Sequence, residues 1–450
     1  MTGNHKLFRP QRRYRSACGL VLAGLLLIGL PPALAVQSPE QEEQAERDAH
    51  DTEQDPQPEE TPPPSKSDYD DAAMGGSTAV GSQLVADDRV KKSLVDLFVP
   101  GSYYDFKRRI KNDHGIELNI DYNFLNQYAS NSSTDRQASS GALRLYGRWI
   151  PQGEKRPIRR AMVFRVETRH VIGSGVTPRD LGFDAGSALS TPSFKSFSWG
   201  VTSLYWEQSF ANRRFAFVAG QMDPGDFEDL HPLLNAWTDF MSDASFNNPT
   251  TALPQQGLGI VGRLFFTDHV YLAGGVSDAN GSPKAIDFSS FFQTREYFTW
   301  AEVGWAPRKA LSGDGIHFTA WHADERTEAQ VPESWGVAFS AAGKLNRWHP
   351  YLRAGYSPRD DESPVLLSSM LSVGIGVDVR SDDRVGAAVT WGQPPQLEAR
   401  DQFSAEAWYR LQLIDNVQLS PGVQWTLHPA MNFDRNSIWV LSVVRIRVMF

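Results

Sequence analysis

The chain has 450 residues, 41% of them hydrophobic, and a formal net charge of −9 at pH 7. The negative charge argues against nucleic acid as a partner, because proteins hold the phosphate backbone with Lys and Arg. The length suits one large domain or two ordinary ones. Apart from a stretch near the N-terminus, no long apolar run appears, so helical membrane spans are not expected.

Residues 1–35 have the pattern of a secretory signal peptide. Basic residues up to Arg15 precede an apolar stretch over about 19–30, and Ala33-Leu34-Ala35 then supplies the small residues of a cleavage site. The apolar stretch is shorter than the roughly 20 residues that a spanning helix needs. The single cysteine, Cys18, lies inside this segment, so the mature chain is expected to carry no thiol and no disulfide.

An acidic segment follows the signal peptide. Residues 37–71 are rich in Glu, Asp, Gln and Pro and contain almost no aliphatic side chains. Such a composition cannot bury enough apolar surface to offset the entropy of ordering. We therefore expect a disordered acidic linker over 36–87, and a periplasmic partner-binding tail is the alternative. Residues 88–114 mix Leu97 and Phe106 with Lys and Arg, which indicates one or two short helices.

In the remainder of the chain, segments of about ten residues alternate apolar and polar side chains. In one of them Phe164 and Val166 alternate with Arg165, Glu167 and Arg169. A period of two places one apolar and one charged face on a strand. A soluble sandwich rarely lines one face with two arginines and a glutamate, whereas a barrel with a water-filled interior does so.

The connections between these segments alternate between short turns and long loops, the longest over about 171–198, 222–256 and 278–296. Outer-membrane barrels place tight turns on the periplasmic side and long loops outside, and their strand number is even. We therefore predict an all-β protein, a transmembrane antiparallel β-barrel of about 16 strands over 115–450 in the outer membrane of a Gram-negative bacterium. The expected strands lie near 115–128, 140–150, 160–170, 199–209, 213–221, 257–265, 269–277, 297–306, 315–323, 334–342, 349–356, 370–379, 384–391, 402–411, 417–426 and 437–450.

The last segment ends on an aromatic residue, Phe450. A terminal aromatic on an amphipathic strand resembles the recognition signal of the barrel assembly machinery, which we expect as a partner beside outer-membrane lipid. Arg445 and Arg447 are expected to face the lumen. One apolar face is expected to hold Ile438, Val440, Val444, Ile446, Val448 and Phe450.

The sequence shows no clear signature of a dinucleotide, metal or catalytic site. Residues 257–262 match G-x-G-x-x-G, but a dinucleotide site needs that turn to open a helix, and these glycines lie in an expected strand. The scattered histidines have no metal-ligand spacing, so no metal and no cofactor are expected. No G-x-S-x-G or comparable signature is present, so we do not expect an enzyme, although an outer-membrane hydrolase is kept as an alternative.

The loop over about 222–256 combines carboxylates with aromatic side chains. It is the third long loop, and general porins fold this loop into the lumen, where opposed charges then set selectivity. Aromatic rings stack on sugar rings while charged and amide groups bond hydroxyls, although these aromatics would equally serve to pack the loop. The candidate constriction residues are Arg144, Arg148, Arg165, Glu167, Arg169, Glu207, Gln221, Asp223, Asp226 and Trp237.

Several short stretches resemble the carbohydrate-selective outer-membrane porins of the OprB type. The clearest are Leu204-Tyr205-Trp206-Glu207-Gln208, the segment 213–223, and Phe246-Asn247-Asn248-Pro249, with Gly115-Ile116 and the closing R-x-R-x-x-F in addition. The resemblance covers about 110–450, and its specific part is 199–262. It implies a sixteen-stranded barrel that passively admits monosaccharides, often glucose. The acidic segment lies outside the family pattern.

The function expected from these observations is passive diffusion of small carbohydrates through a charged constriction. The first alternative is a barrel scaffold that binds a periplasmic or export partner through its acidic tail, and the second is the hydrolase. A homotrimer is left open, because trimers are common among sixteen-stranded porins but this is an argument from analogy.

Overall fold

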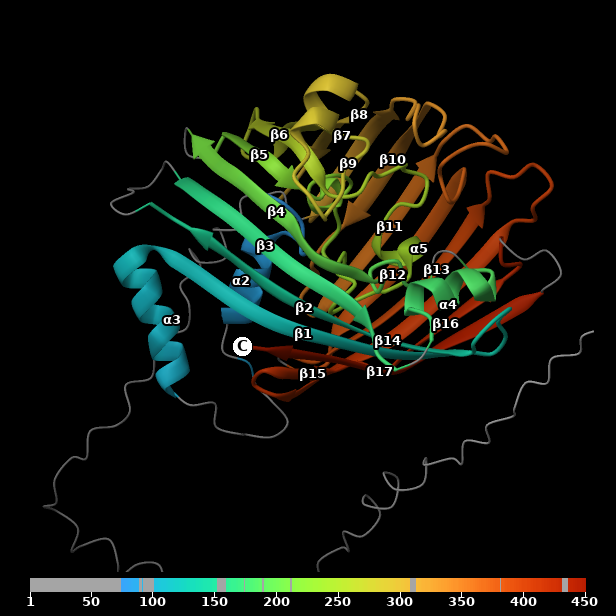
Figure 1. The fold of residues 1–450 in the computed structure, drawn as a ribbon, viewed down its shortest axis with the longest axis horizontal. Helices are drawn as coiled ribbons and strands as arrows, with labels where there is room; N and C mark the ends of the chain where they lie inside the picture. The colour runs from blue at the N-terminus through green and yellow to red at the C-terminus, as the bar shows by residue number, and fades with distance from the viewer. Residues whose placement is uncertain are drawn as a thin grey trace, which may run out of the picture. The chain divides into compact units, whose positions relative to one another are not determined.

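The computed structural model describes residues 74–88, 91, 101–151, 159–173, 175–187, 190–210, 213–307, 313–380, 382–430 and 436–450. The expected signal peptide and the acidic segment 37–71 lie outside the described residues. The described strands form one closed antiparallel sheet, in which each strand pairs with its neighbours in sequence and β1 pairs with β17 (Figure 1). The strands are β1 (Ile116–Ala129), β2 (Gln137–Trp149), β3 (Arg159–Val171), β4 (Phe197–Phe210), β5 (Phe215–Met222), β6 (Gly257–Phe265), β7 (Val270–Asp278), β8 (Tyr297–Trp305), β9 (Gly315–Ala323), β10 (Ser334–Ala342), β11 (Trp348–Tyr356), β12 (Ser369–Asp378), β13 (Arg384–Gln393), β14 (Gln402–Ile414), β15 (Val417–Leu419), β16 (Gly422–Leu427) and β17 (Ser437–Met449).

β15 and β16 together occupy the position of one barrel strand. If each such position is called a stave, the barrel has sixteen staves among the described residues, as predicted. β15 and β16 both lie between β14 and β17 and pair with each of them. The interruption falls at Ser420 and Pro421, and proline has no N–H to donate to the ladder.

The side chains alternate between lumen and exterior. On β9, Ile316 and Phe318 are 48% and 60% exposed, whereas the intervening His317 and Thr319 are buried. Exposed aromatic side chains stand near both ends of the strands, as in the interfacial girdles of membrane barrels. They are Trp149, Trp305 and Trp348 at the end where β4 meets β5, here called the short-turn end, and Trp335, Phe403 and Trp439 at the opposite, long-loop end.

One expectation for the last strand is wrong. The register between β1 and β17 slips at Asn126, so that Val444 and Ser442 occupy successive pairing positions and residue 443 is extra. A bulge of one residue reverses which side chains face inward. Ile438 and Val440 therefore face the lumen and pack against α4, while Arg445 and Arg447 face the lumen after the bulge.

The C-terminal residue completes the seam of the barrel. The backbones of Phe450 and Ile120 exchange two hydrogen bonds, and the Phe450 side chain is half exposed. Recognition of Phe450 by the assembly machinery stays a prediction.

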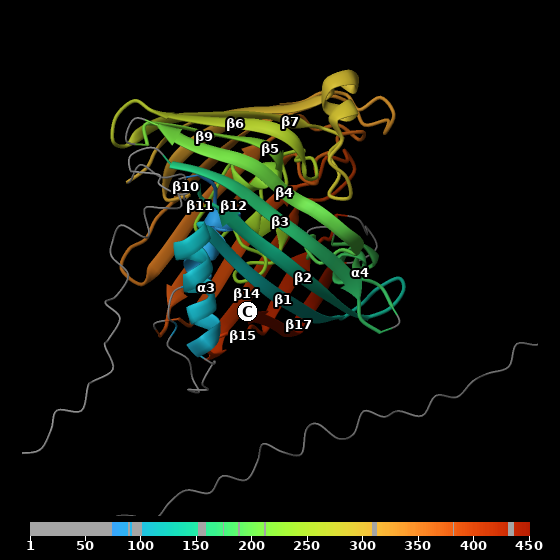
Figure 2. The ribbon, with the colours of Figure 1, turned by 60° about the vertical axis from the view of Figure 1, so that its left-hand side comes forward.

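Helices stand at both ends of the barrel. The helix α3 (Gly101–His114) precedes β1 at the short-turn end, and α4 (Pro178–Ala185) lies in the loop between β3 and β4 at the opposite end, as Figures 1 and 2 both show. The loop between β5 and β6 carries two short turns of helix, η1 (Pro224–Asp226) and α5 (Asp243–Phe246), and η2 (Ser290–Thr294) precedes β8. Among the described residues, no helix is both long and apolar enough to cross a bilayer.

The expectation of a disordered linker over 36–87 is wrong for its last part, residues 74–87, which are ordered in the structure. Residues 74–79 are ordered by contacts with the loop between β5 and β6, and α2 (Val80–Asp88) packs against β1, β2 and β3. The lumen is therefore less wet than expected, because this segment, the loop and the wall share an apolar core. Its members include Met74, Val80, Leu84, Phe227, Leu230, Leu234, Tyr205, Trp300 and Trp321.

Candidate functional site

A pocket of about 330 Å³ lies in the lumen between the loop 223–256, the wall of β2 and β3, and the loop that carries α4. The loop 223–256 connects the long-loop ends of β5 and β6 and folds back into the barrel, where most of its side chains are buried. Seven of the predicted constriction residues line the pocket. They are Arg144, Arg165, Glu167, Arg169, Asp223, Asp226 and Trp237.

Each wall arginine of the pocket has a carboxylate partner. Arg144 binds both carboxylate oxygens of Asp121, and Arg169 binds Glu167 at 3.1 Å. Arg165 lies 3.4 Å from Asp226 of the loop. The wall and the loop therefore present charges of both signs to the pocket.

The Trp237 ring stacks against two of these guanidinium groups. Its ring centre lies 4.4 Å from the guanidinium carbon of Arg144 and 5.1 Å from that of Arg169. Such contacts are favourable because the ring face is electronegative. Trp237 also packs on Phe194 and is only 6% exposed, so it both packs the loop and lines the pocket.

Two basic residues on the α4 loop were missed by sequence reasoning. Arg179 and Lys195 line the pocket, and Lys195 Nζ lies 3.0 Å from the amide oxygen of Gln255 across the mouth. Burial, together with the nearby Arg169 and Arg179, lowers the pKa of Lys195 to about 8. Thr177 caps α4 in a capping box with Asp180, which fixes the helix that carries Arg179.

The acidic side of the pocket belongs to the loop. Asp223 accepts hydrogen bonds from the backbone N–H of Gly225 and the amide of Gln256, which closes the base of the loop. Burial raises the pKa of Asp226 to about 6. The nearby Asp223 carboxylate also raises this pKa, and the Arg165 guanidinium lowers it only in part. Burial also raises the pKa of Asp243 to about 6.

Three predicted residues lie outside the pocket. Arg148 pairs with Glu117 nearer the short-turn end. The Gln221 amide donates to the backbone carbonyls of Gln256 and Ser282 and so supports the loop from behind. Glu207 is buried elsewhere in the lumen.

The loop is fixed to the opposite wall by a buried network around Asp229. This carboxylate accepts hydrogen bonds from Arg353 at 2.5 Å, Ser340 at 2.5 Å and Asn248 at 2.7 Å, and His317 lies 3.1 Å away. Burial would raise the pKa of Asp229, but the Arg353 guanidinium outweighs it and holds that pKa well below its usual range.

A second set of bonds holds the middle of the loop. Arg445 donates to the carbonyls of Ala236 and Asp239, and Glu406 accepts from the backbone N–H groups of Met241 and Ser242. The loop is thereby braced from two sides of the barrel.

A closed antiparallel barrel of sixteen staves, belted with apolar side chains and narrowed by an inward-folded loop, is the architecture of a porin of the bacterial outer membrane. Residues 371–450 match the model of the carbohydrate-selective porin, OprB family, so the resemblance predicted from the sequence is confirmed over these residues. Its specific part, 199–262, lies outside the match. No curated protein matches the chain.

One solved porin, Pseudomonas putida OprB, shares the fold in its high-pH structure. The high-pH structure of Pseudomonas putida OprB is 10% identical and superposes with a TM-score of 0.59 over 79% of this chain and 99% of that chain. The low-pH structure of the same protein gives 13% identity and a TM-score of 0.47 over 78% and 98%. A triple mutant of the Rhodopseudomonas blastica porin gives 15% identity and a TM-score of 0.44 over 74% of this chain and 100% of that chain.

Proposed function

We propose that the chain is a passive porin that admits small carbohydrates, monosaccharides such as glucose among them, through the pocket between the loop 223–256 and the wall of β2 and β3. The observation that carries the proposal is the composition of this pocket. Paired charges of both signs surround it, and the aromatic side chain of Trp237 lines it.

Neutral sugars suit such a pocket for two reasons. Guanidinium and ammonium groups donate hydrogen bonds and carboxylates accept them, so a hydroxyl finds partners for both its proton and its lone pairs. A volume of about 330 Å³ is also near the lower end of the roughly 300–1,000 Å³ range of small-molecule sites. Size therefore favours a single sugar ring over a longer saccharide.

The test is liposome swelling with the mature chain, comparing glucose, a disaccharide and an amino acid of similar size. The ratio of the glucose rate to the amino-acid rate is the quantity to measure, because it does not depend on the fraction of channels that are open. We expect glucose to enter fastest.

A matched pair of tryptophan variants assigns this preference to the pocket. Trp237→Leu should lower the glucose to amino-acid ratio by about two- to tenfold, the value of one aromatic contact. Trp439→Leu, on the exposed face of β17, should leave the ratio unchanged. Equal ratios for all three proteins would overturn the assignment of sugar preference to this pocket.

A further inference from the structure

Residues 74–88 precede the barrel in sequence but lie inside it, between the pocket and the short-turn end. Thr78 lines the pocket, and its carbonyl accepts a hydrogen bond from Arg165 at 3.0 Å. From there α2 follows the lumenal faces of β1, β2 and β3 toward the short-turn end, where Asp88 binds Lys107 of α3. The helix therefore lies between the pocket and that end of the barrel.

The upper part of the segment is bonded to the loop 223–256. The N–H of Gly76 donates to the carbonyl of Asp226 at 2.7 Å, and the Ser77 hydroxyl donates to the carbonyl of Leu234. The Asn235 amide donates to the carbonyl of Ser77 at 3.1 Å. Since this loop also forms one wall of the pocket, the segment and the pocket share the same support.

A tight turn sets the approach to α2. Gly75 has a φ of +97°, and a Cβ at this position would lie 2.5 Å from the Cβ of Ala79 and 3.0 Å from the carbonyl oxygen of Asp226. Glycine is the residue that adopts this conformation without strain. The turn therefore fits closely against the loop.

Apolar side chains fill the space between the segment and its surroundings. Val80 and Leu84 are 0% and 1% exposed, and with Met74 they belong to the same core as Phe227 and Leu230 of the loop. A tail that merely passed through a water-filled lumen would leave these side chains wet. The segment is packed as an element of the fold.

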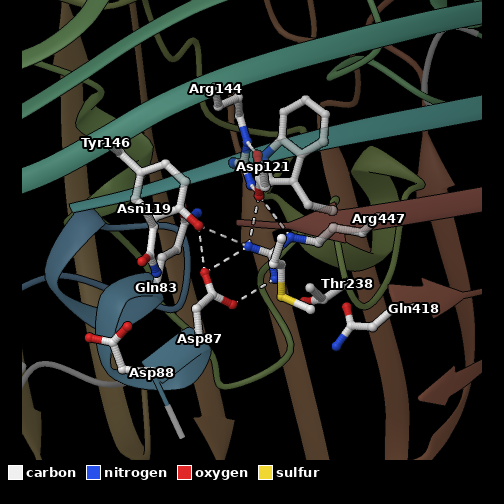
Figure 3. Close-up of polar contacts among 12 residues, drawn as sticks. Gln83, Asp87, Asp88, Asn119, Asp121, Arg144, Tyr146, Thr238, Gln418 and Arg447 are labelled. Carbon is white, nitrogen blue, oxygen red and sulfur yellow. Dashed lines mark hydrogen bonds and ion pairs between the residues drawn. The ribbon is translucent and has the colours of Figure 1, made fainter. Parts of the chain in front are cut away.

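The lower part of the segment ends in a buried ionic latch, which we define as Asp87, Tyr146, Arg447 and Asp121 (Figure 3). Arg447 binds the two oxygens of Asp87 at 2.9 and 2.8 Å, and Tyr146 donates to the same carboxylate. Arg447 also donates to Asp121 at 2.8 Å, and Asp121 in turn holds Arg144 of the pocket wall. The latch thus connects the helix to the pocket.

We propose that residues 74–88 are a plug that closes the short-turn side of the pocket, and that solute leaves the pocket toward this side only after the plug undocks. This inference rests on the proposed porin function. A helix with its side chains is about 10–12 Å across, and α2 places this width along β1, β2 and β3 inside the barrel. A buried ion pair suits a latch, because undocking separates Asp87 from Arg447, while Arg447 keeps Asp121 and the barrel wall stays intact.

Conductance in planar bilayers and glucose-driven swelling test the plug. Wild type should be mostly closed. Asp87→Asn should raise the open fraction by at least about tenfold, because it removes the charge that binds the helix to Arg447, while Arg447 keeps Asp121 as its partner in the docked and undocked states alike. Asp88→Asn is the matched control, since the neighbouring Asp88 is partly exposed and binds Lys107 outside the latch, and it should behave as wild type.

Deletion of 74–88 provides a variant that does not depend on the latch and should conduct most. For every variant, heat-modifiable migration on gels verifies that the barrel has formed. Equal conductance of wild type, Asp87→Asn and the deletion would refute the plug and leave the porin function intact. No conductance from any of these folded proteins, the deletion included, would overturn the porin function and the plug with it.

Discussion

Arg353→Met is the change that most directly tests how the inward loop is held. Arg353 and Asp229 are 1% and 0% exposed, and they form an ion pair at 2.5 Å between β11 and the loop. Removing one partner of a buried pair typically costs about 3–5 kcal/mol. Asp229 keeps its bonds to Ser340 and Asn248, so we expect the lower end, about 3 kcal/mol.

The cost should appear as local opening of the loop, because the Asp229 carboxylate regains water once the loop leaves the wall. A change of about 3 kcal/mol corresponds to roughly a hundredfold faster amide hydrogen exchange. Mass spectrometry of peptides from 226–248 measures this exchange, and peptides from the strands serve as an internal reference that should not change.

Arg410→Met is the matched control. It removes an arginine from Asp239 of the same loop at 3.2 Å, but Arg384 remains 3.4 Å from that carboxylate. The two arginine side chains are also partly exposed, so the cost should stay below about 1 kcal/mol, or about fivefold in exchange. Loop exchange in Arg353→Met within about fivefold of wild type would refute the idea that this pair fixes the loop.

Two further predictions concern charge. Because the pKa of Lys195 is lowered to about 8, its amine is protonated below that pH and loses its charge as the pH rises through it. Labelling of Lys195 with an amine reagent, measured by mass spectrometry, should therefore be half-maximal near pH 8. A labelling midpoint above about pH 10, the range of an ordinary lysine, would contradict the buried environment. Phe318→Arg places a charge on the lipid face of β9 and should lower the unfolding free energy in vesicles by about 2–4 kcal/mol. An unfolding free energy equal to that of the wild type would contradict the assigned orientation.

The strands could be predicted closely because a membrane imposes a strict period on them. Lipid on one side and a polar lumen on the other force alternation along each strand, as in Phe164, Arg165 and Val166. The bulge at residue 443 could not be read in this way, since apolar residues stand on both sides of it. Pro421, which divides the stave between β14 and β17, lies inside the expected strand 417–426, where a proline cannot donate to the ladder.

The pocket residues were only partly predictable, because alternation gives the face of a strand and not the depth along it. Arg144 and Arg148 share the lumenal face of β2, yet they lie about 13 Å apart along it at the usual rise of a strand. The first lines the pocket and the second pairs with Glu117. Depth depends on the register between strands, which one sequence alone does not reveal.

The plug segment was missed for a different reason. Val80 and Leu84 are its main apolar contacts, and two such residues in a nine-residue helix make no periodic signal. The preceding acidic composition then favoured a linker over the whole stretch. Its order comes from contacts with residues far away in the sequence.

The latch has a consequence for how the molecule is assembled. Asp121 belongs to the first strand and Arg447 to the last. The site that binds Asp87 therefore forms only when these two strands pair and close the barrel. In a chain whose first and last strands have not yet paired, the binding site for Asp87 is incomplete, and α2 cannot dock. Docking of α2 therefore depends on closure of the barrel, because the first and last strands form its binding site only when they pair.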